Sequence, residues 1–193
     1  MNTKIYQMGS AILRKVSRQV AVEELQKQPS RARECIATLD KALTEFRAVK
    51  GFGRGIAANQ VGFDLRIIML NLGEGNFPLV NPKITQKSKE TFTIFDDCMS
   101  VEHGELLVRV ERSEHVEVAY LDGDGEERIM AGHDSSVSEL LQHEIDHLDG
   151  VLMIDRATAH AESGISSVAR QDFESKRSYY AGLCDHTITP TIH

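Results

Sequence analysis

One short stretch constrains this chain more than any other feature: residues 143–147 read HEIDH. Two residues that stand four apart on a helix lie on the same side of it, one turn apart. Two imidazoles placed in this way can bind a single metal ion, and the glutamate between them can reach a water on that ion and shuttle its proton. The pattern predicts a hydrolytic metal site on a helix. A purely structural pair of histidines is the alternative.

The residues around this stretch favour a helix over 136–148. Ser136 and Glu139 have the spacing of a capping box, and Gly150 stands where a left-handed residue often ends a helix. An apolar stripe at helical spacing predicts one buried face. Its members are Val137, Leu140, Leu141, Ile145 and Leu148.

A catalytic site of this type has three protein ligands and one open position, so the third ligand decides the class of hydrolase. The metzincin pattern continues as far as Gly150, but Met153 stands where its third histidine belongs. Glu162 and Glu174 fit a gluzincin by position, without a convincing second motif helix. Cys98 offers a thiolate, although a lone cysteine is more often a small buried apolar residue.

A glycine-rich loop over residues 51–62 forms a second constellation. It lacks the third glycine of a dinucleotide-binding fingerprint and the Gly-Lys-Ser/Thr of a phosphate-binding loop. Its small residues indicate backbone that lies close to another group. Gln60 at its end is a neutral hydrogen-bond donor, and a tight loop with a surface glutamine is the alternative.

The rest of the chain combines helices with a β-rich middle. Helical spacing predicts a helix over about 30–49, and residues 5–22 are expected to be irregular. Pro82 places the second of the predicted strands near a sheet edge. One more helix is expected within 163–183, followed by ten weakly ordered residues. Strands are predicted over 66–72, 77–85, 106–111 and 115–121, the last forming a hairpin with 127–132.

Charge and cysteine content narrow the function classes. The formal net charge of −7 argues against charge-driven nucleic-acid binding, and no apolar run approaches the ~20 residues of a membrane helix. The three cysteines are widely separated, as is usual in a reducing compartment, so we expect a cytoplasmic protein. We expect Arg109 and Arg112 on the surface of a strand and no chemistry at Cys35 or Cys184. Surface or loop positions are also expected for His103, His115, His133, His160, His186 and His193.

Three ordered motifs resemble those of a known family. GRGIAANQ at 53–60 resembles G-x-G-x-A-A-x-Q, DDCMS at 96–100 is similar to E-G-C-L-S, and QHEIDH at 142–147 matches Q-H-E-x-D-H. These are the motifs of peptide deformylases, and the resemblance covers roughly residues 4–157. It implies an α+β fold, in which antiparallel sheets pack around a central metal-binding helix. It also implies a catalytic domain over 1–160, followed by a C-terminal helix and tail over 161–193.

The resemblance also implies roles for single residues. The implied metal ligands are Cys98, His143 and His147, with Glu144 as the general acid and base. Gln60 and the backbone N–H of Met99 would stabilise the oxyanion. The substrate groove would be lined by Gly53, Gly55, Ile56 and Asp97.

The activity implied is removal of the formyl group from N-formyl-methionyl peptides of nascent proteins, at or near the ribosome. The resemblance suggests Fe²⁺ as the native ion, and the ligand set is also compatible with Zn²⁺, Ni²⁺ or Co²⁺. No membrane or nucleic-acid sequence is an expected partner, and a monomer or a homodimer is expected. The alternatives are an amidase for another N-formylated compound and a metal-binding homologue without catalysis.

The cysteine motif departs from the family pattern. Asp97 stands where the family has glycine, Asp96 replaces glutamate and Met99 replaces leucine. These changes leave the implied catalytic side chains intact and cluster near the expected groove. We therefore predict that hydrolysis is retained and that substrate preference is shifted.

Overall fold

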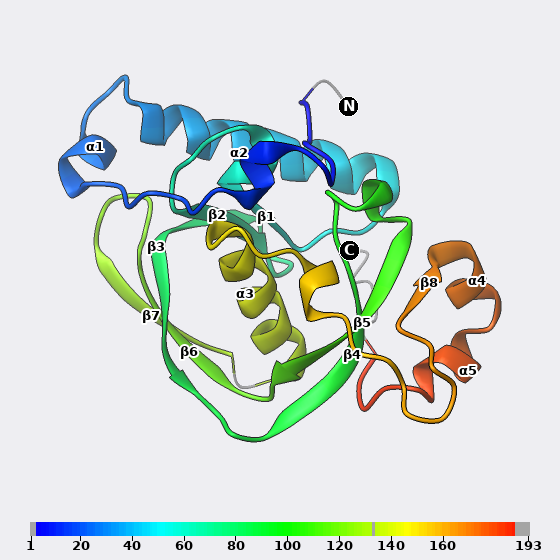
Figure 1. The fold of residues 1–193 in the computed structure, drawn as a ribbon. Coiled ribbons are helices and arrows are strands. Elements are labelled where there is room, and N and C mark those ends of the chain that lie inside the picture. Colours follow the sequence, from blue (N-terminus) through cyan, green and yellow to red (C-terminus); the bar gives the residue numbers. More distant parts are fainter. Residues whose placement is uncertain (1–2, 133, 188–193) are drawn as a thin grey trace.

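Helix α3 (Ser135–Leu148) lies between two antiparallel sheets, as Figure 1 shows. The computed structural model describes residues 3–132 and 134–187. The expectations for His133, His193 and the last six residues therefore lie outside the described residues. The α+β class and the central helix predicted from the sequence are confirmed.

The larger sheet has five strands in the order β1-β2-β3-β6-β7, and the smaller has three in the order β4-β5-β8. All pairings between these strands are antiparallel. The strands are β1 (Gly55–Ala57), β2 (Ile67–Asn71), β3 (Asn76–Lys87), β4 (Thr91–Asp97), β5 (Leu106–Ser113), β6 (Val116–Leu121), β7 (Glu127–Gly132) and β8 (Ser167–Ala169).

The remaining elements surround the sheets. Helix α2 packs over β1 and β2 at the top of Figure 1, and β8 and the two last helices lie beside β5. The α-helices besides α3 are α1 (Val22–Gln26), α2 (Arg31–Lys50), α4 (Arg170–Ser175) and α5 (Arg177–Ala181). The 3-10 helices are η1 (Ala11–Arg14), η2 (Ala58–Val61), η3 (Glu102–Gly104) and η4 (Met153–Arg156).

Helix α3 has an apolar face and a polar face, and both faces are buried. Its apolar face, with Leu141, Ile145 and Leu148, packs against strands β2, β3 and β6. Its polar face carries the two histidines toward the loop after β4. The helix begins two residues earlier than a Ser136 cap would place it, because Asp134 is the N-cap and its carboxylate accepts a hydrogen bond from Val137 N at 2.9 Å.

Gly150 follows α3 in the left-handed conformation, with φ +74°, as predicted from the sequence. A Cβ at this position would lie 2.7 Å from the carbonyl oxygen of Arg14, which belongs to backbone and cannot rotate away. The replacement Gly150→Ala should therefore lower the free energy of unfolding by more than the 1–2 kcal/mol typical of a left-handed L-residue. Gly164→Ala is the control, since φ is +70° and nothing lies within 4 Å. Equal losses in urea unfolding would show that the Arg14 contact does not matter.

One sequence expectation about the strands was wrong, and one strand was not predicted. Strand β3 lies inside the larger sheet, between β2 and β6, and not at an edge. Pro82 is tolerated there because the β3–β6 register shifts between Val80 and Lys83, so no ladder hydrogen bond is needed from its nitrogen. Strand β4, which leads directly to Cys98, was not predicted.

The C-terminal region also differs from the expectation of one helix over 163–183. Its residues form β8, α4 and α5, and β8 pairs with β5. The backbone of Lys176, with φ −130° and ψ 39°, separates the two short helices. The division of the chain at residue 160 remains a prediction.

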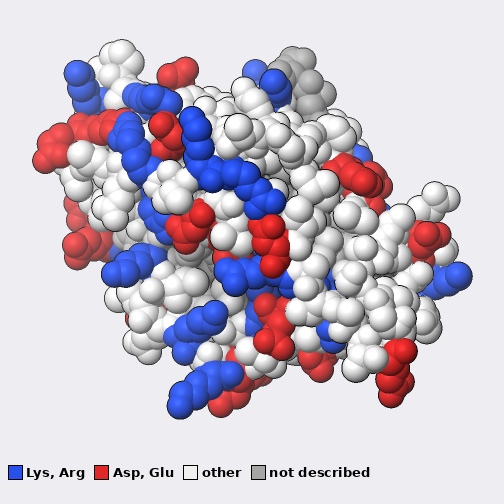
Figure 2. All heavy atoms as spheres, in the orientation of Figure 1, with Lys and Arg blue, Asp and Glu red and all other residues white. Residues whose placement is uncertain are grey.

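The surface shown in Figure 2 carries acidic and basic side chains side by side. Within residues 3–132 and 134–187, no helix is both long enough and apolar enough to cross a bilayer.

Candidate active site

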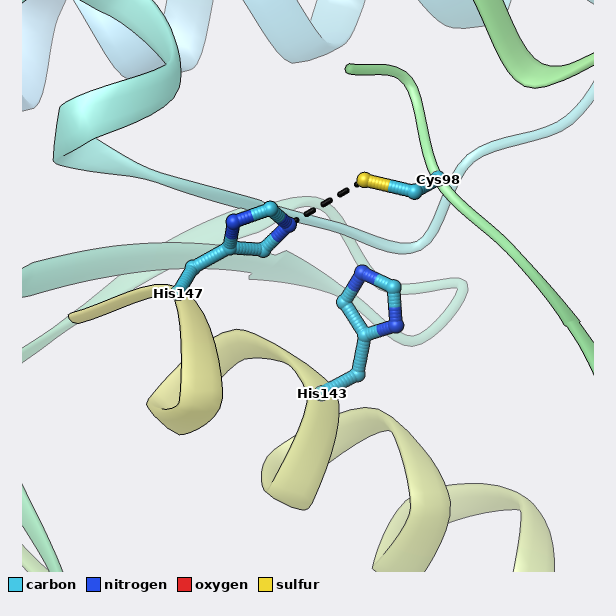
Figure 3. Close-up of side chains that lie close together, drawn as sticks. All are labelled: Cys98, His143 and His147. Atoms are coloured by element: carbon cyan, nitrogen blue, oxygen red, sulfur yellow. Dashed lines mark hydrogen bonds between the residues drawn. The ribbon is translucent and has the colours of Figure 1, made fainter. Parts of the chain in front are cut away.

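The thiol of Cys98 and the imidazoles of His143 and His147 face one another, as Figure 3 shows. One donor atom from each lies within 4.8 Å of the others, and Cys98 Sγ is 3.1 Å from His147 Nε2. Helix α3 supplies both histidines, and the turn after β4 supplies the cysteine. One sulfur and two nitrogens are the ligands that zinc and iron-group ions accept, so the donor set fits a divalent transition metal.

Burial perturbs these three groups strongly. It raises the pKa of the Cys98 thiol and lowers the pKa of His147 well below its usual range. Burial would also lower the pKa of His143, but Asp96 raises it well above its usual range. A cation bound among them would favour the thiolate and the neutral imidazoles that coordination requires.

A buried chain of charges orients His143. Its Nδ1 lies 2.8 Å from Asp96 Oδ2, which in turn lies 3.2 Å from Arg112 Nη2. Arg112 Nη1 donates to Asp146 Oδ2 at 2.5 Å. The arginine side chain is only 3% exposed, so its expected position on the strand surface was wrong. A carboxylate on the far nitrogen of a ligand histidine fixes its tautomer and ring orientation.

Gln60 is buried beside Cys98 and is not a surface residue. Its Oε1 accepts a hydrogen bond from Ala57 N at 2.7 Å, which leaves the amide nitrogen pointing to the cysteine loop. Gln60 Nε2 lies 3.0 Å from Ser100 Oγ and 3.7 Å from Cys98 Sγ. Met99 is nearly buried and lines the same cavity. The structure thus places the amide of Gln60 beside Cys98, and Met99, the next residue in the chain, lines the cavity with them.

Asn59 was missed in the sequence analysis. It is fully buried, and its Nδ2 donates to the carbonyl oxygen of His147 at 2.5 Å. This bond ties the glycine-rich loop to the end of α3. Its position beside Gln60 was the only signal in the sequence.

Glu144 lines the same cavity as Cys98 and His143 and is 3% exposed. Burial raises the pKa of Glu144 to about 7. Its Oε2 is buried and receives no hydrogen bond from the described residues. A buried polar atom of this kind calls for a partner that is not part of the chain, such as a water on a metal ion.

Three of the four predicted groove residues line this cavity, namely Gly53, Gly55 and Asp97. Ile56 does not, because its side chain is fully buried in the core beneath α2. Asp97 forms an ion pair with Arg170 of α4, so the aspartate that departs from the family motif binds the C-terminal region.

Gly55 is in close contact with Glu144. A Cβ at Gly55 would lie 2.8 Å from Glu144 Cδ, although its backbone is not left-handed and would accept alanine. We expect Gly55→Ala to displace the carboxylate and to lower kcat by about 10²-fold, the cost of a small misplacement at a reacting centre. The melting temperature should change little. Gly182→Ala, whose Cβ would meet only ordinary contacts, is the control, and equal activity in both variants would contradict the assigned position.

A family model described as "Polypeptide deformylase" matches residues 2–163. The chain belongs to the peptide deformylase family. This confirms the resemblance seen in the three sequence motifs, and the family is metal-dependent.

Curated relatives support the assignment to the deformylase family. Peptide deformylase 2 of Clostridium perfringens is 33% identical over 157 residues, which is 80% of this chain and 92% of that protein. The peptide deformylase of Thermoanaerobacter pseudethanolicus is 41% identical over 105 residues, or 54% of this chain. The chain spans 64% of the length of that second protein.

Solved deformylase structures share the fold. The peptide deformylase from Thermotoga maritima superimposes with a TM-score of 0.70 at 29% identity, over 81% of this chain and 97% of that one. The deformylase from Synechococcus elongatus, solved in complex with actinonin, gives a TM-score of 0.69 at 28% identity. That match covers 80% of this chain and 78% of the other.

Proposed function

We propose that this deformylase-family protein hydrolyses the formyl group from the N-terminus of N-formylated peptides and releases formate. One observation carries the proposal. The side chains of Cys98, His143 and His147 converge, and the buried carboxylate of Glu144 and the amide of Gln60 line the same cavity as Cys98 and His143. A metal-binding role without catalysis would need neither Glu144 nor Gln60.

The metal would be held by Cys98, His143 and His147, whose donor atoms already lie together. We propose Fe²⁺ as the native ion, and Zn²⁺, Ni²⁺ and Co²⁺ suit the same ligands. Such an ion supplies Lewis acidity, lowering the pKa of a water that it binds and polarising the formyl carbonyl.

Glu144 would move the protons. With a pKa of about 7, its carboxylate can accept a proton from the attacking water near neutral pH. It then donates that proton to the amine nitrogen as the C–N bond breaks, which leaves formate and a free N-terminus. Gly55 makes this position available, because any larger residue would occupy the space of the carboxylate.

Gln60 Nε2 and the backbone N–H of Met99 would stabilise the oxygen on which negative charge develops. Gln60 is pre-oriented, because Ala57 N fixes its other amide atom. The hydrogen bond from Gln7 Nε2 to Met99 O, at 3.0 Å, holds the cysteine loop from the opposite side. One such donor in a buried site contributes about 3 kcal/mol to the transition state.

The test is formate release from N-formyl-methionyl peptides by protein loaded with Fe²⁺ or Ni²⁺. We expect turnover with the loaded protein and none with protein stripped by a chelator, with recovery on addition of metal. N-acetyl peptides of the same sequence are the control for the small acyl group. If the metal-loaded protein released formate no faster than the metal-free protein, the proposal would be wrong.

The proposal includes a setting for this activity. N-formylated chains emerge from ribosomes, so we propose action near the ribosome, in the cytoplasm, by a monomer or a homodimer. A reducing compartment would suit the three cysteines, all of which are free thiols, and would keep Cys98 competent to bind metal.

A further inference from the structure

Two ion pairs line the cavity beside the candidate metal site, and the proposed chemistry uses neither. In the first, Arg54 Nη2 lies 2.7 Å from Glu139 Oε2, with the two side chains 14% and 2% exposed. In the second, Arg170 of α4 pairs with Asp97. The second pair is more open, because the Asp97 side chain is 37% exposed. A pair as deeply buried as Arg54 and Glu139 is unusual in the wall of a cavity unless a ligand meets it.

The first pair is adjacent to the reacting centre. Glu139 precedes His143 by one turn on α3, so the two side chains are neighbours on one helix face. Arg54 precedes Gly55, where an added Cβ would overlap the Glu144 side chain. When a formyl group lies at Glu144, the side chain of the residue that carries it is within reach of Arg54 and Glu139.

The pair is held in place. Arg54 Nη1 donates to the carbonyl oxygen of Ser136 at 2.9 Å and to its Oγ at 2.7 Å. The carbonyl oxygen of Arg54 accepts from Asn71 N at 2.8 Å. Glu139 accepts its hydrogen bond at Oε2 alone, and residues 3–132 and 134–187 donate none to its other oxygen. The pair therefore offers spare hydrogen-bonding capacity at a fixed position.

Apolar side chains contribute part of the cavity wall, next to charged residues that include Arg170, Glu174 and Arg177, and they are Phe95, Leu107, Leu140 and Phe173. Phe95 and Phe173 are in edge contact, with ring centroids 5.6 Å apart. The cavity thus suits a side chain with an apolar stem and a polar end.

The ion pair selects the chemistry of that polar end. A purely apolar end would remove water from buried charges and return no hydrogen bond. A charged end would add net charge to a pair that is neutral as a unit. A neutral amide avoids both costs, because its N–H can donate to Glu139 and its carbonyl can accept from Arg54.

We propose that Arg54 and Glu139 determine specificity, and that the enzyme favours N-formylated substrates whose first side chain ends in a carboxamide, as in glutamine. This inference rests on the proposed deformylation and refines its substrate class. It assigns a physical cause to the shifted preference predicted from the sequence.

The experiment compares kcat/KM for formyl-X-Ala-Ala peptides in which X is glutamine, norleucine, methionine or glutamate. Wild-type protein should favour glutamine over norleucine, and over glutamate, by tenfold or more. The double variant Arg54→Leu/Glu139→Leu removes both charges together, so neither is left unpaired. It should shift the glutamine-to-norleucine ratio toward norleucine by tenfold or more.

The exposed pair Lys50–Glu105 provides a matched control, since Lys50→Met/Glu105→Gln should leave the ratio unchanged. A wild-type preference for norleucine or methionine overturns the inference, and so does a ratio that the Arg54→Leu/Glu139→Leu variant does not move. The wild-type ratio decides alone if that variant does not fold. Formate release with the wrong preference overturns this inference only, whereas no formate from any peptide overturns the proposed function with it.

Discussion

Replacement of Glu144 with alanine should lower kcat/KM for formate release by about 10²–10⁴-fold, the range typical of a lost general acid and base. The cause is the loss of the buried carboxylate that lies against Gly55 in the cavity lined by Cys98 and His143. The three ligand side chains are untouched, so the metal content should equal that of the wild type. Formate release and metal analysis on the same preparation measure both effects.

Two further variants make the result specific to proton transfer. Glu144→Gln keeps the shape of the side chain and should lose nearly as much activity as the alanine variant. Glu111→Ala, at an exposed position on β5, should be close to wild type. If Glu144→Gln retained wild-type turnover, the proposed role of Glu144 would be wrong, whatever the alanine variant did.

Local sequence patterns correctly predicted the structural features that are set by residues close together in the chain. The spacing of His143 and His147 and the apolar stripe belong to one helix, and the left-handed Gly150 follows its end. Helix α3 has these features as predicted. Helix α2 was equally regular, with Ser30 as N-cap and Gly51 in the left-handed C-cap. The position of Cys98 beside the histidines was predicted from ligand chemistry and from the family motif. Spacing along the sequence could not predict it, because the turn that holds Cys98 and the helix are far apart in the chain.

The features that the sequence did not predict share a different physical cause. Each depends on pairing with residues that are distant in the sequence. Residues 167–169 have no strand pattern of their own, and they are extended because β5 supplies a partner. Strand β4 ends in two aspartates, which disfavour a strand, yet Asp96 and Asp97 are each neutralised by an arginine from another element. The Arg54–Glu139 pair was missed for the same reason, since its members are 85 residues apart.

The burial of Arg112 is the feature that could have been predicted from the sequence. Along β5, residues with even numbers face the same side, and Val108 and Val110 are buried on it. Extending the alternation by one step puts Arg112 inside. A buried arginine requires carboxylate partners, and Asp96 and Asp146 stand in the two metal-ligand motifs. The arginine therefore joins the cysteine motif to the helix motif.

Arg112→Met should lower the free energy of unfolding by about 3–5 kcal/mol, because it leaves buried Asp96 without its cation. It should also weaken metal binding by about 10–100-fold, since Asp96 then orients His143 less well. Urea unfolding of the metal-free protein and metal titration measure the two effects separately. Arg109→Met on the same strand is the control, because Arg109 donates to Leu183 O and Thr158 Oγ1 and not to Asp96 or Asp146, so its loss should change metal affinity little.

The pH dependence separates loss of this ion pair from loss of packing. Burial would raise the pKa of Asp96, but His143 and Arg112 hold it well below its usual range. A depressed carboxyl pKa stabilises the fold above the unfolded pKa of about 3.9, and this stabilisation is lost as the pH falls toward the folded value. The stability gap between wild type and Arg112→Met should therefore be widest near pH 7 and narrow below pH 4. A gap that stays constant over this range would assign the loss to packing of the arginine stem, and the charge chain would then not be what fixes His143.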